Sequence, residues 1–242
     1  MSPKHHRSFD MIFPILISFL GLLLIAVLTA FPPIVTGNIP WRKPLIGSIF
    51  SSICILGILA VFSPTQCLKI LELRKKKSTS NFSSGKFVSH RLSSSLQGHH
   101  PNCGKFSAHV FRIRSKTFCA ACTGLFFGGL LALTGALLYF FGNWRIAEQN
   151  SSLMVLLGIL GVGLGLFQFK FRNLVRLLLN TLFVLGTLVI LIGIDEFVHS
   201  LMFDLFVVGL ILFWLFTRIS LSQWDHKRIC SDCNVAGCEL AE

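Results

Sequence analysis

Six of the eight cysteines lie in two short clusters, each with histidine nearby and each at the boundary between a polar and an apolar stretch. The first cluster comprises His99, His100, Cys103, His109, Cys119 and Cys122. A tetrahedral zinc site needs four nitrogen or sulfur donors, so the three cysteines with any one of these histidines would complete it. Cys119 and Cys122 form a CxxC pair at a predicted helix start, where the helix dipole favours metal-binding thiolates.

The second cluster contains four further donors, His226, Cys230, Cys233 and Cys238. Two arrangements are open. Each cluster could form its own site of three cysteines and one histidine, or Cys119 and Cys122 could share one site with Cys230 and Cys233. We expect zinc, with an iron–sulfur cluster as second choice. Free cysteines in a reducing compartment and thiol redox chemistry are the remaining alternatives.

Composition places the chain in a lipid bilayer. Hydrophobic residues make up 53% of it and charged residues 13%, against about 25% charged in soluble domains. A helix of about 20 apolar residues crosses the hydrocarbon core, and six segments qualify: Met11–Val35, Pro44–Ser63, Thr117–Gly142, Ser151–Phe169, Leu174–Ile194 and Leu201–Phe216. The sequence therefore predicts an all-α polytopic membrane protein of about six transmembrane helices, with a small Cys/His-rich cytoplasmic insertion.

This pattern divides the chain into four regions. They are a two-helix hairpin (1–66), a basic, Ser-rich cytoplasmic loop with the Cys/His element (67–116), a four-helix bundle (117–218) and a cytoplasmic Cys-rich tail (219–242). Within the loop, residues 110–114 alternate with a period of two, which predicts a short strand. Recurrent glycines in the third and fourth spans are typical of closely packed membrane helices.

Charge predicts the orientation. If the amino terminus is cytoplasmic, every Lys and Arg except Arg42, Lys43 and Arg145 lies inside, as the positive-inside rule requires. We therefore expect an inner-membrane protein with both termini in the cytoplasm. The basic segment 71–77 suits an anionic inner leaflet, and a protein could dock on the same face. Nucleic acid is not an expected partner, because no nucleic-acid-binding motif accompanies the charge.

Two polar groups lie near the ends of the spans. At the predicted inner side, a phosphate or lipid head group could be bound by Gln168, Arg172, Asn173 and Arg176, although positive-inside anchoring is the simpler interpretation. At the predicted outer turn, the polar residues are Asp195, Glu196, His199 and Asp204. Carboxylates beside a histidine could relay protons if they were buried, but a solvated loop is the expectation here.

The segment Phe118–Leu125 (FCAACTGL), preceded by Cys103, resembles a motif of an uncharacterised family of small prokaryotic membrane proteins. That family has a Cys-His element, followed by a CARCTG-like motif at the mouth of a transmembrane helix. Gly104 and Ala121 stand where the family has His and the Arg of CARCTG. Its later Gln and Arg/Asn positions are similar to Gln168, Arg172, Asn173 and Arg176. The resemblance covers about a third of the chain and implies no established activity.

Three functions fit these residues. The leading hypothesis is a non-enzymatic membrane module whose metal-braced cytoplasmic face docks a partner or lipid. An alternative is a membrane enzyme acting on a lipid or phosphorylated substrate at that face, with Arg172 and Arg176 binding the anion and an open metal position activating water. A metal or proton transporter is the other alternative, and its weakness is the scarcity of ionisable residues within the spans.

Overall fold

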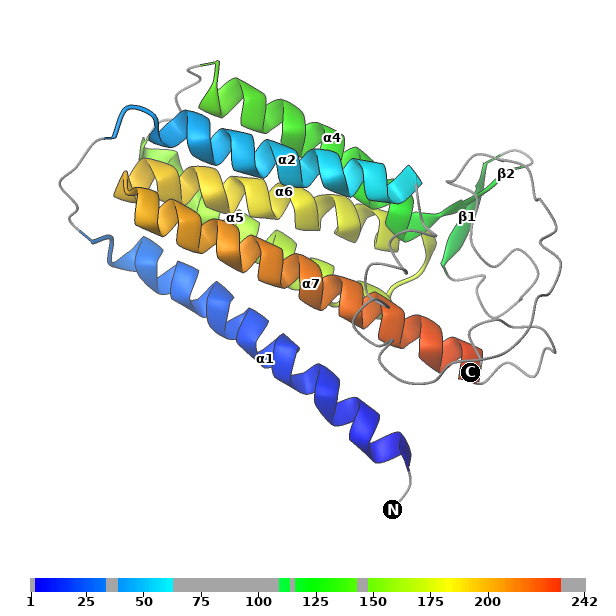
Figure 1. Cartoon of the computed structure of the whole chain (residues 1–242). Helices are drawn as coiled ribbons and strands as arrows, with labels where there is room; N and C mark the ends of the chain where they lie inside the picture. The colour runs from blue at the N-terminus through cyan, green and yellow to red at the C-terminus, as the bar shows by residue number, and fades with distance from the viewer. Residues whose placement is uncertain (1–2, 34–38, 63–108, 114–115, 143–147, 232–242) are drawn as a thin grey trace, which may run out of the picture.

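The computed structural model describes residues 3–33, 39–62, 109–113, 116–142 and 148–231 (Figure 1). Six helices fall within these ranges: α1 (Pro3–Ala30), α2 (Arg42–Phe62), α4 (Ala120–Phe140), α5 (Glu148–Leu166), α6 (Asn173–Val198) and α7 (Leu201–Ser231). Two short strands, β1 (Val110–Ile113) and β2 (Lys116–Cys119), precede α4, and a 3-10 turn, η2 (Gln168–Lys170), joins α5 to α6.

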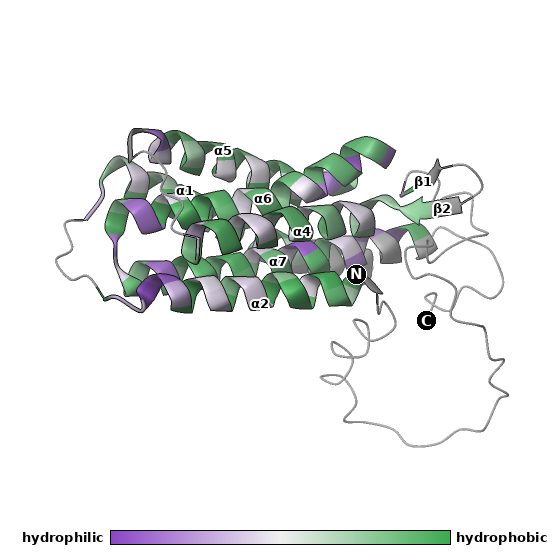
Figure 2. Ribbon diagram, turned by 90° about the horizontal axis from the view of Figure 1, so that it is seen from above, coloured by the Kyte–Doolittle hydropathy of each residue, from purple (hydrophilic) through white to green (hydrophobic). Residues whose placement is uncertain are grey.

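The helices are those of a multi-pass membrane protein. Five of them are long and apolar enough to cross a bilayer, and the apolar part of the sixth, α5, is shorter and covers Asn150–Leu166. Hydrophobic residues occupy the middle parts of the helices, whereas hydrophilic residues gather toward their ends (Figure 2). The prediction of an all-α polytopic membrane protein with about six apolar helices is therefore confirmed.

Helix α6 lies at the centre of the bundle and is the most buried of the five long apolar helices. It packs against α4, α5 and α7, while α2 lies on α4, and α1 runs along the edge in contact with α5 and α7 (Figure 1). Glycine allows the closest of these approaches. A Cβ atom on Gly186 of α6 would lie 2.7 Å from the carbonyl oxygen of Gly158 on α5. The prediction that glycines serve helix packing agrees with this contact.

A small antiparallel hairpin precedes α4. Strands β1 and β2 pair in the register Val110↔Cys119 to Ile113↔Lys116, and the rings of Phe111 and Phe118 stack across it with centroids 5.8 Å apart. The strand expected at 110–114 is confirmed, and its partner β2 was not predicted. Since β2 runs directly into α4, the hairpin fixes how the CxxC pair enters the helix.

Helix α7 extends beyond its predicted end. The last span was expected to stop at Phe216 and the tail to begin at residue 219, but α7 continues to Ser231 without interruption. Most of the loop 67–116 and the final part of the tail lie outside the described residues. We call the end of the bundle where α4 begins the cysteine end, and the end where α6 meets α7 the Asp195 end.

Candidate functional site

The CxxC pair lies where the sequence predicts, at the start of α4. Cys119 is the N-cap residue with extended backbone angles (φ −74°, ψ 118°), and Cys122 lies in the first turn. Both side chains are partly buried. The hydroxyl of Thr123 donates a hydrogen bond to the carbonyl oxygen of Cys119 (2.8 Å), which holds the first turn. Both sulfur atoms are therefore held at a helix amino terminus, where thiolates are favoured.

The structure describes only some of the other predicted metal ligands. His99, His100, Cys103, Cys233 and Cys238 lie outside the described residues. The backbone of His226 and Cys230 belongs to α7, but their side chains are not described. Among the residues that are described, no three His, Cys, Asp or Glu side chains come together as a metal site. The zinc site stays a prediction that needs donors from the segments around it.

His109 lies directly before β1, next to the CxxC pair, and its carbonyl oxygen accepts from the backbone N–H of Ala120 (3.0 Å). Its Nε2 atom lies 3.1 Å from Nη1 of Arg176 and 3.6 Å from Oδ2 of Asp225. A guanidinium can only donate hydrogen bonds, so Nε2 must accept, and the ring is neutral with its proton on Nδ1. His109 thus joins the hairpin to α6 through Nε2, which leaves that nitrogen engaged.

Arg176 and Asp225 connect α6 to α7 at the cysteine end. Arg176 Nη2 donates to Asp225 Oδ2 across 3.2 Å, and the Arg176 side chain is 1% exposed. Asn180, one turn further along α6, donates from Nδ2 to the carbonyl oxygen of Arg176 (2.6 Å). Its Oδ1 accepts from Nε of Arg218 (2.9 Å) and also from Nη2 of the same residue. Sequence reasoning missed Asn180 and Arg218, and it considered Asp225 only as a carboxylate near the second cysteine cluster.

These five side chains form what we call the His109 cluster: His109, Arg176, Asn180, Arg218 and Asp225. It contains two buried guanidinium groups and one carboxylate, and with His109 neutral its net charge is +1. Arg218 also lies close enough to Cys119 and Cys122 for Coulombic interaction. Burying an uncompensated charge is costly, so this end of the bundle favours negative charge on the two sulfur atoms.

Burial divides the four residues predicted to bind an anion. Gln168 and Arg176 are buried, each with 1% exposure, whereas Arg172 and Asn173 are exposed. The guanidinium of Arg176 contacts His109 and Asp225 instead of facing the same water as Arg172. The amide atoms of Gln168 make no hydrogen bond within the described part of the chain. Arg172 and Arg176 are therefore not arranged to bind one phosphate together.

The Asp195 end holds a second set of buried charges, and the expectation of a solvated loop there is wrong. Asp195 and Asp204 are 0% exposed. We call the Asp195 cluster the group formed by Arg42, Lys43, Tyr139, Asp195, Glu196 and Asp204. The sequence did contain a sign of this burial, because the positive charges of Arg42 and Lys43 were predicted on the same side of the membrane. Oppositely charged residues at the same ends of neighbouring apolar spans can pair and become buried.

The contacts of the Asp195 cluster are short and shared. Arg42 Nη1 lies 2.6 Å from Asp195 Oδ1 and 2.6 Å from Asp204 Oδ2. Lys43 Nζ lies 3.1 Å from Glu196 Oε1 and 3.3 Å from Asp195 Oδ2. The hydroxyl of Tyr139 contacts Asp195 Oδ2 (2.6 Å) and Glu196 Oε1 (2.5 Å). The cluster therefore ties α2, α4, α6 and α7 together.

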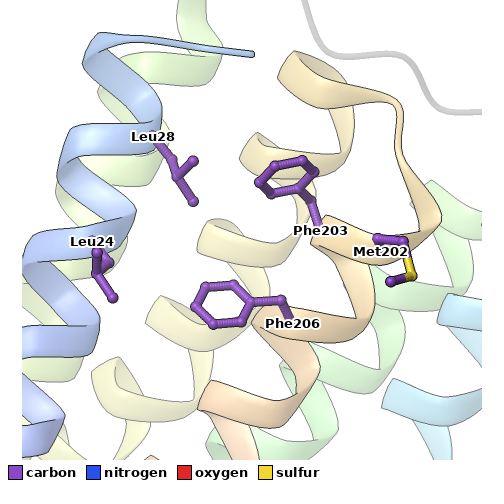
Figure 3. Close-up of a pocket in the computed structure, with 5 residues that line it drawn as sticks. All are labelled: Leu24, Leu28, Met202, Phe203 and Phe206. Atoms are coloured by element: carbon purple, nitrogen blue, oxygen red, sulfur yellow. The ribbon is translucent and has the colours of Figure 1, made fainter. Parts of the chain in front are cut away.

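An apolar groove of about 310 Å³ opens between α1 and α7 near the Asp195 end. Figure 3 shows its lining residues, Leu24, Leu28, Met202, Phe203 and Phe206. None of these side chains carries a group for catalysis or for binding a polar ligand. The groove is a surface that lipid chains can cover, and the chemistry of the described residues lies in the two polar clusters.

Comparisons with known protein families, with curated proteins and with solved structures found no match. The His109 cluster offers positive charge within electrostatic range of two cysteines, and the Asp195 cluster offers carboxylates in contact with a tyrosine. The first suits a site that contains thiolates, and the second suits proton binding.

Proposed function

We propose that this chain is an inner-membrane protein whose cytoplasmic end binds zinc through Cys119 and Cys122. In this proposal the remaining donors come from the loop before β1 or the tail after α7, and the ion fastens these basic segments to the helix bundle. The braced face then docks a protein partner or the anionic leaflet. The observation that carries the proposal is the CxxC pair at the start of α4, within electrostatic range of the buried Arg218 guanidinium.

Charge balance supports a thiolate-rich site. A zinc ion bound by three thiolates and one neutral histidine has a net charge of −1. The His109 cluster has a net charge of +1, since two guanidiniums face one carboxylate and a neutral imidazole. Zinc held by Cys119, Cys122, one further cysteine and one histidine would therefore make the cysteine end neutral as a whole. Two protonated thiols would leave the buried positive charge uncompensated.

A structural role is favoured over catalysis on a phosphorylated substrate. The enzyme hypothesis needs Arg172 and Arg176 free to bind an anion, but Arg176 is buried and contacts both His109 and Asp225. The cluster instead connects β1, α6 and α7 directly beside the start of α4. A metal ion added at this point would secure segments that already meet there.

Transport through the bundle is less well supported than a structural role. Ionisable residues are buried at both ends of the bundle, although the sequence suggested that such residues were scarce in the spans. Between the two clusters, however, the largest fully buried side chains are apolar and include Phe183, Ile190, Leu191, Ile211 and Trp214. The described residues thus place an apolar layer between the charges of the two ends.

The proposed orientation agrees with the pairing of the basic residues. Arg42 and Lys43 are exceptions to the positive-inside pattern, and each contacts carboxylates of α6 or α7. Their charges are balanced within the protein, so they weigh little against a cytoplasmic cysteine end.

The proposal is tested by measuring metal in the full-length protein purified in detergent without chelator. We expect zinc in the unaltered chain, and loss of most of it in Cys119→Ser and Cys122→Ser. Cys54→Ala is the matched control, because Cys54 is buried in the hydrophobic core and should leave the zinc content unchanged. A metal-free unaltered protein, or equal zinc in all four proteins, would refute the site.

A further inference from the structure

The hydroxyl of Tyr139 is within hydrogen-bond distance of two carboxyl oxygens, although it has only one hydrogen to donate. It lies 2.6 Å from Asp195 Oδ2 and 2.5 Å from Glu196 Oε1. A phenol can donate once, and ionised carboxylates can only accept. At such separations a hydrogen lies between the two oxygens of each contact. The phenol supplies the hydrogen for one of these contacts. The hydrogen in the other contact must therefore belong to a carboxyl group.

The remaining contact of the phenol is consistent with this assignment. Lys43 Nζ lies 3.1 Å from the Tyr139 oxygen and donates to it. A phenol oxygen has one hydrogen and two acceptor sites. It therefore donates to one carboxylate, accepts from Lys43 and accepts from the other carboxyl group. Every hydrogen-bonding position of Tyr139 is filled only if Asp195 or Glu196 is protonated.

Charge counting leads independently to the same number of protons. The Asp195 cluster has three carboxyl groups and two cations, so full ionisation would leave a net charge of −1. Asp195 and Asp204 are 0% exposed, and a buried net charge of this kind is costly. One added proton neutralises the cluster. Oδ1 of Asp204 makes no hydrogen bond to any described residue, so no described side chain offers that oxygen a further donor.

Among the described residues, the other groups around the cluster are exposed or uncharged. His199, which follows α6, contacts the carbonyl oxygen of Asp195 through Nδ1 at 2.7 Å and lies within electrostatic range of Glu196. It is exposed, so water weakens the effect of any charge on its ring. From α5, Ser151 and Val155 face Gly193 on this part of α6, and both are uncharged. The side chains of Arg145 and Glu148 lie outside the described set.

We propose that the Asp195 cluster is a proton-binding site, in which Asp195 and Glu196 share one proton through Tyr139. Glu196 is 15% exposed and Lys43 is 35% exposed, so the site meets water at this end of the bundle. A proton passes between water and Glu196, and the hydrogen bonds of Tyr139 connect Glu196 to the buried Asp195. Removal of the proton leaves two ionised oxygens against one phenol, which loosens the contact of α4 with α6.

Infrared spectroscopy of the full-length protein tests the proposal. At neutral pH we expect the carbonyl band of a protonated carboxylic acid, shifted to lower frequency in D2O. Glu196→Gln should lose the band because the amide supplies the hydrogen without an acid. Asp204→Asn should also lose it, because removing one negative charge makes the cluster neutral without the extra proton, and one of the two Tyr139 contacts then lengthens. Glu239→Gln, a matched change far along the chain in the carboxyl-terminal segment, should keep it.

A second measurement follows the same proton through stability. The melting temperature of the unaltered protein should fall as the pH rises from neutral to alkaline, because the folded state loses a proton on which its contacts depend. In Glu196→Gln this fall should be absent or much reduced. The proposal is overturned if the unaltered protein shows no protonated-carboxyl band, or if Glu196→Gln and Asp204→Asn both retain a band of equal intensity.

Discussion

Arg176 on α6 and Asp225 on α7 form an ion pair, with Nη2 and Oδ2 3.2 Å apart, although 49 residues separate them in the chain. Asp225→Asn would leave the buried guanidinium without its carboxylate. Breaking a buried pair from one side costs about 3 to 5 kcal/mol, so we expect a loss of this size in the free energy of unfolding. Denaturant titration of the protein in detergent measures it.

The exposed Arg172 provides the control for this experiment. Arg172→Gln should change stability by less than about 0.5 kcal/mol, since it alters an exposed side chain. A double replacement, Arg176→Met with Asp225→Leu, should recover part of the loss, because it removes both charges from the interior. If Asp225→Asn is as mild as Arg172→Gln, the ion pair does not hold α6 and α7 together.

Arg42 and Lys43 are adjacent cations whose removal should have unequal effects. Arg42 is 3% exposed and lies between Asp195 and Asp204, whereas Lys43 is 35% exposed. Arg42→Gln should therefore lower the free energy of unfolding by about 3 kcal/mol or more. Lys43→Gln should lower it by about 1 kcal/mol or less. Thermal unfolding of the two variants tests this ranking. Equal melting temperatures would contradict it.

The close approach of α5 to α6 predicts that alanine is harmful at one glycine and harmless at another. A Cβ atom on Gly186 would meet the Gly158 carbonyl oxygen at 2.7 Å, so Gly186→Ala should cost about 1 to 3 kcal/mol through overpacking. A Cβ atom on Gly57 would meet nothing within 4 Å. Gly57→Ala should be neutral or stabilise α2 by up to about 1 kcal/mol. Equal melting temperatures would argue against the α5–α6 contact.

The proposed orientation predicts which end of the bundle an external reagent reaches. Phe31, which follows α1 at the Asp195 end, is 77% exposed, and Phe171, in the turn before α6 at the cysteine end, is 40% exposed. A membrane-impermeant maleimide added to intact cells should label Phe31→Cys and leave Phe171→Cys and the unaltered protein unlabelled. Permeabilised cells should label both variants. Labelling of Phe171→Cys alone in intact cells would reverse the orientation.

Much of the fold could be predicted because membrane helices depend on composition over a length of about 20 residues. The apolar spans, the short strand at 110–114 and the position of Cys119 at a helix start all come from local patterns. Local patterns also explain two boundary errors. The end of α7 was placed too early because its last turns are polar, and β2 was missed because it is short and continues directly into an apolar span.

The polar clusters could not be predicted in the same way, because they depend on which distant residues meet. Arg42 contacts Asp204 across 162 positions of sequence, and neither residue carries a local sign of that pairing. Asp195 was expected in water for the same reason, since a carboxylate near a turn is usually solvated. His109 lies beside the start of α4, as its position in the chain suggested, since its carbonyl oxygen accepts from the backbone N–H of Ala120 (3.0 Å). The contact of its Nε2 with Arg176 of α6 could not be predicted.

Helices α6 and α7 each contribute side chains to both clusters. Arg176 and Asp195 lie near opposite ends of α6, and Asp204 and Asp225 lie near opposite ends of α7. An axial slip of one residue moves a helix by about 1.5 Å, which is enough to break contacts of 2.6 to 3.2 Å at both ends together. The two clusters together thus fix the axial register of α6 against α7. Apolar side chains that face lipid specify such a register poorly.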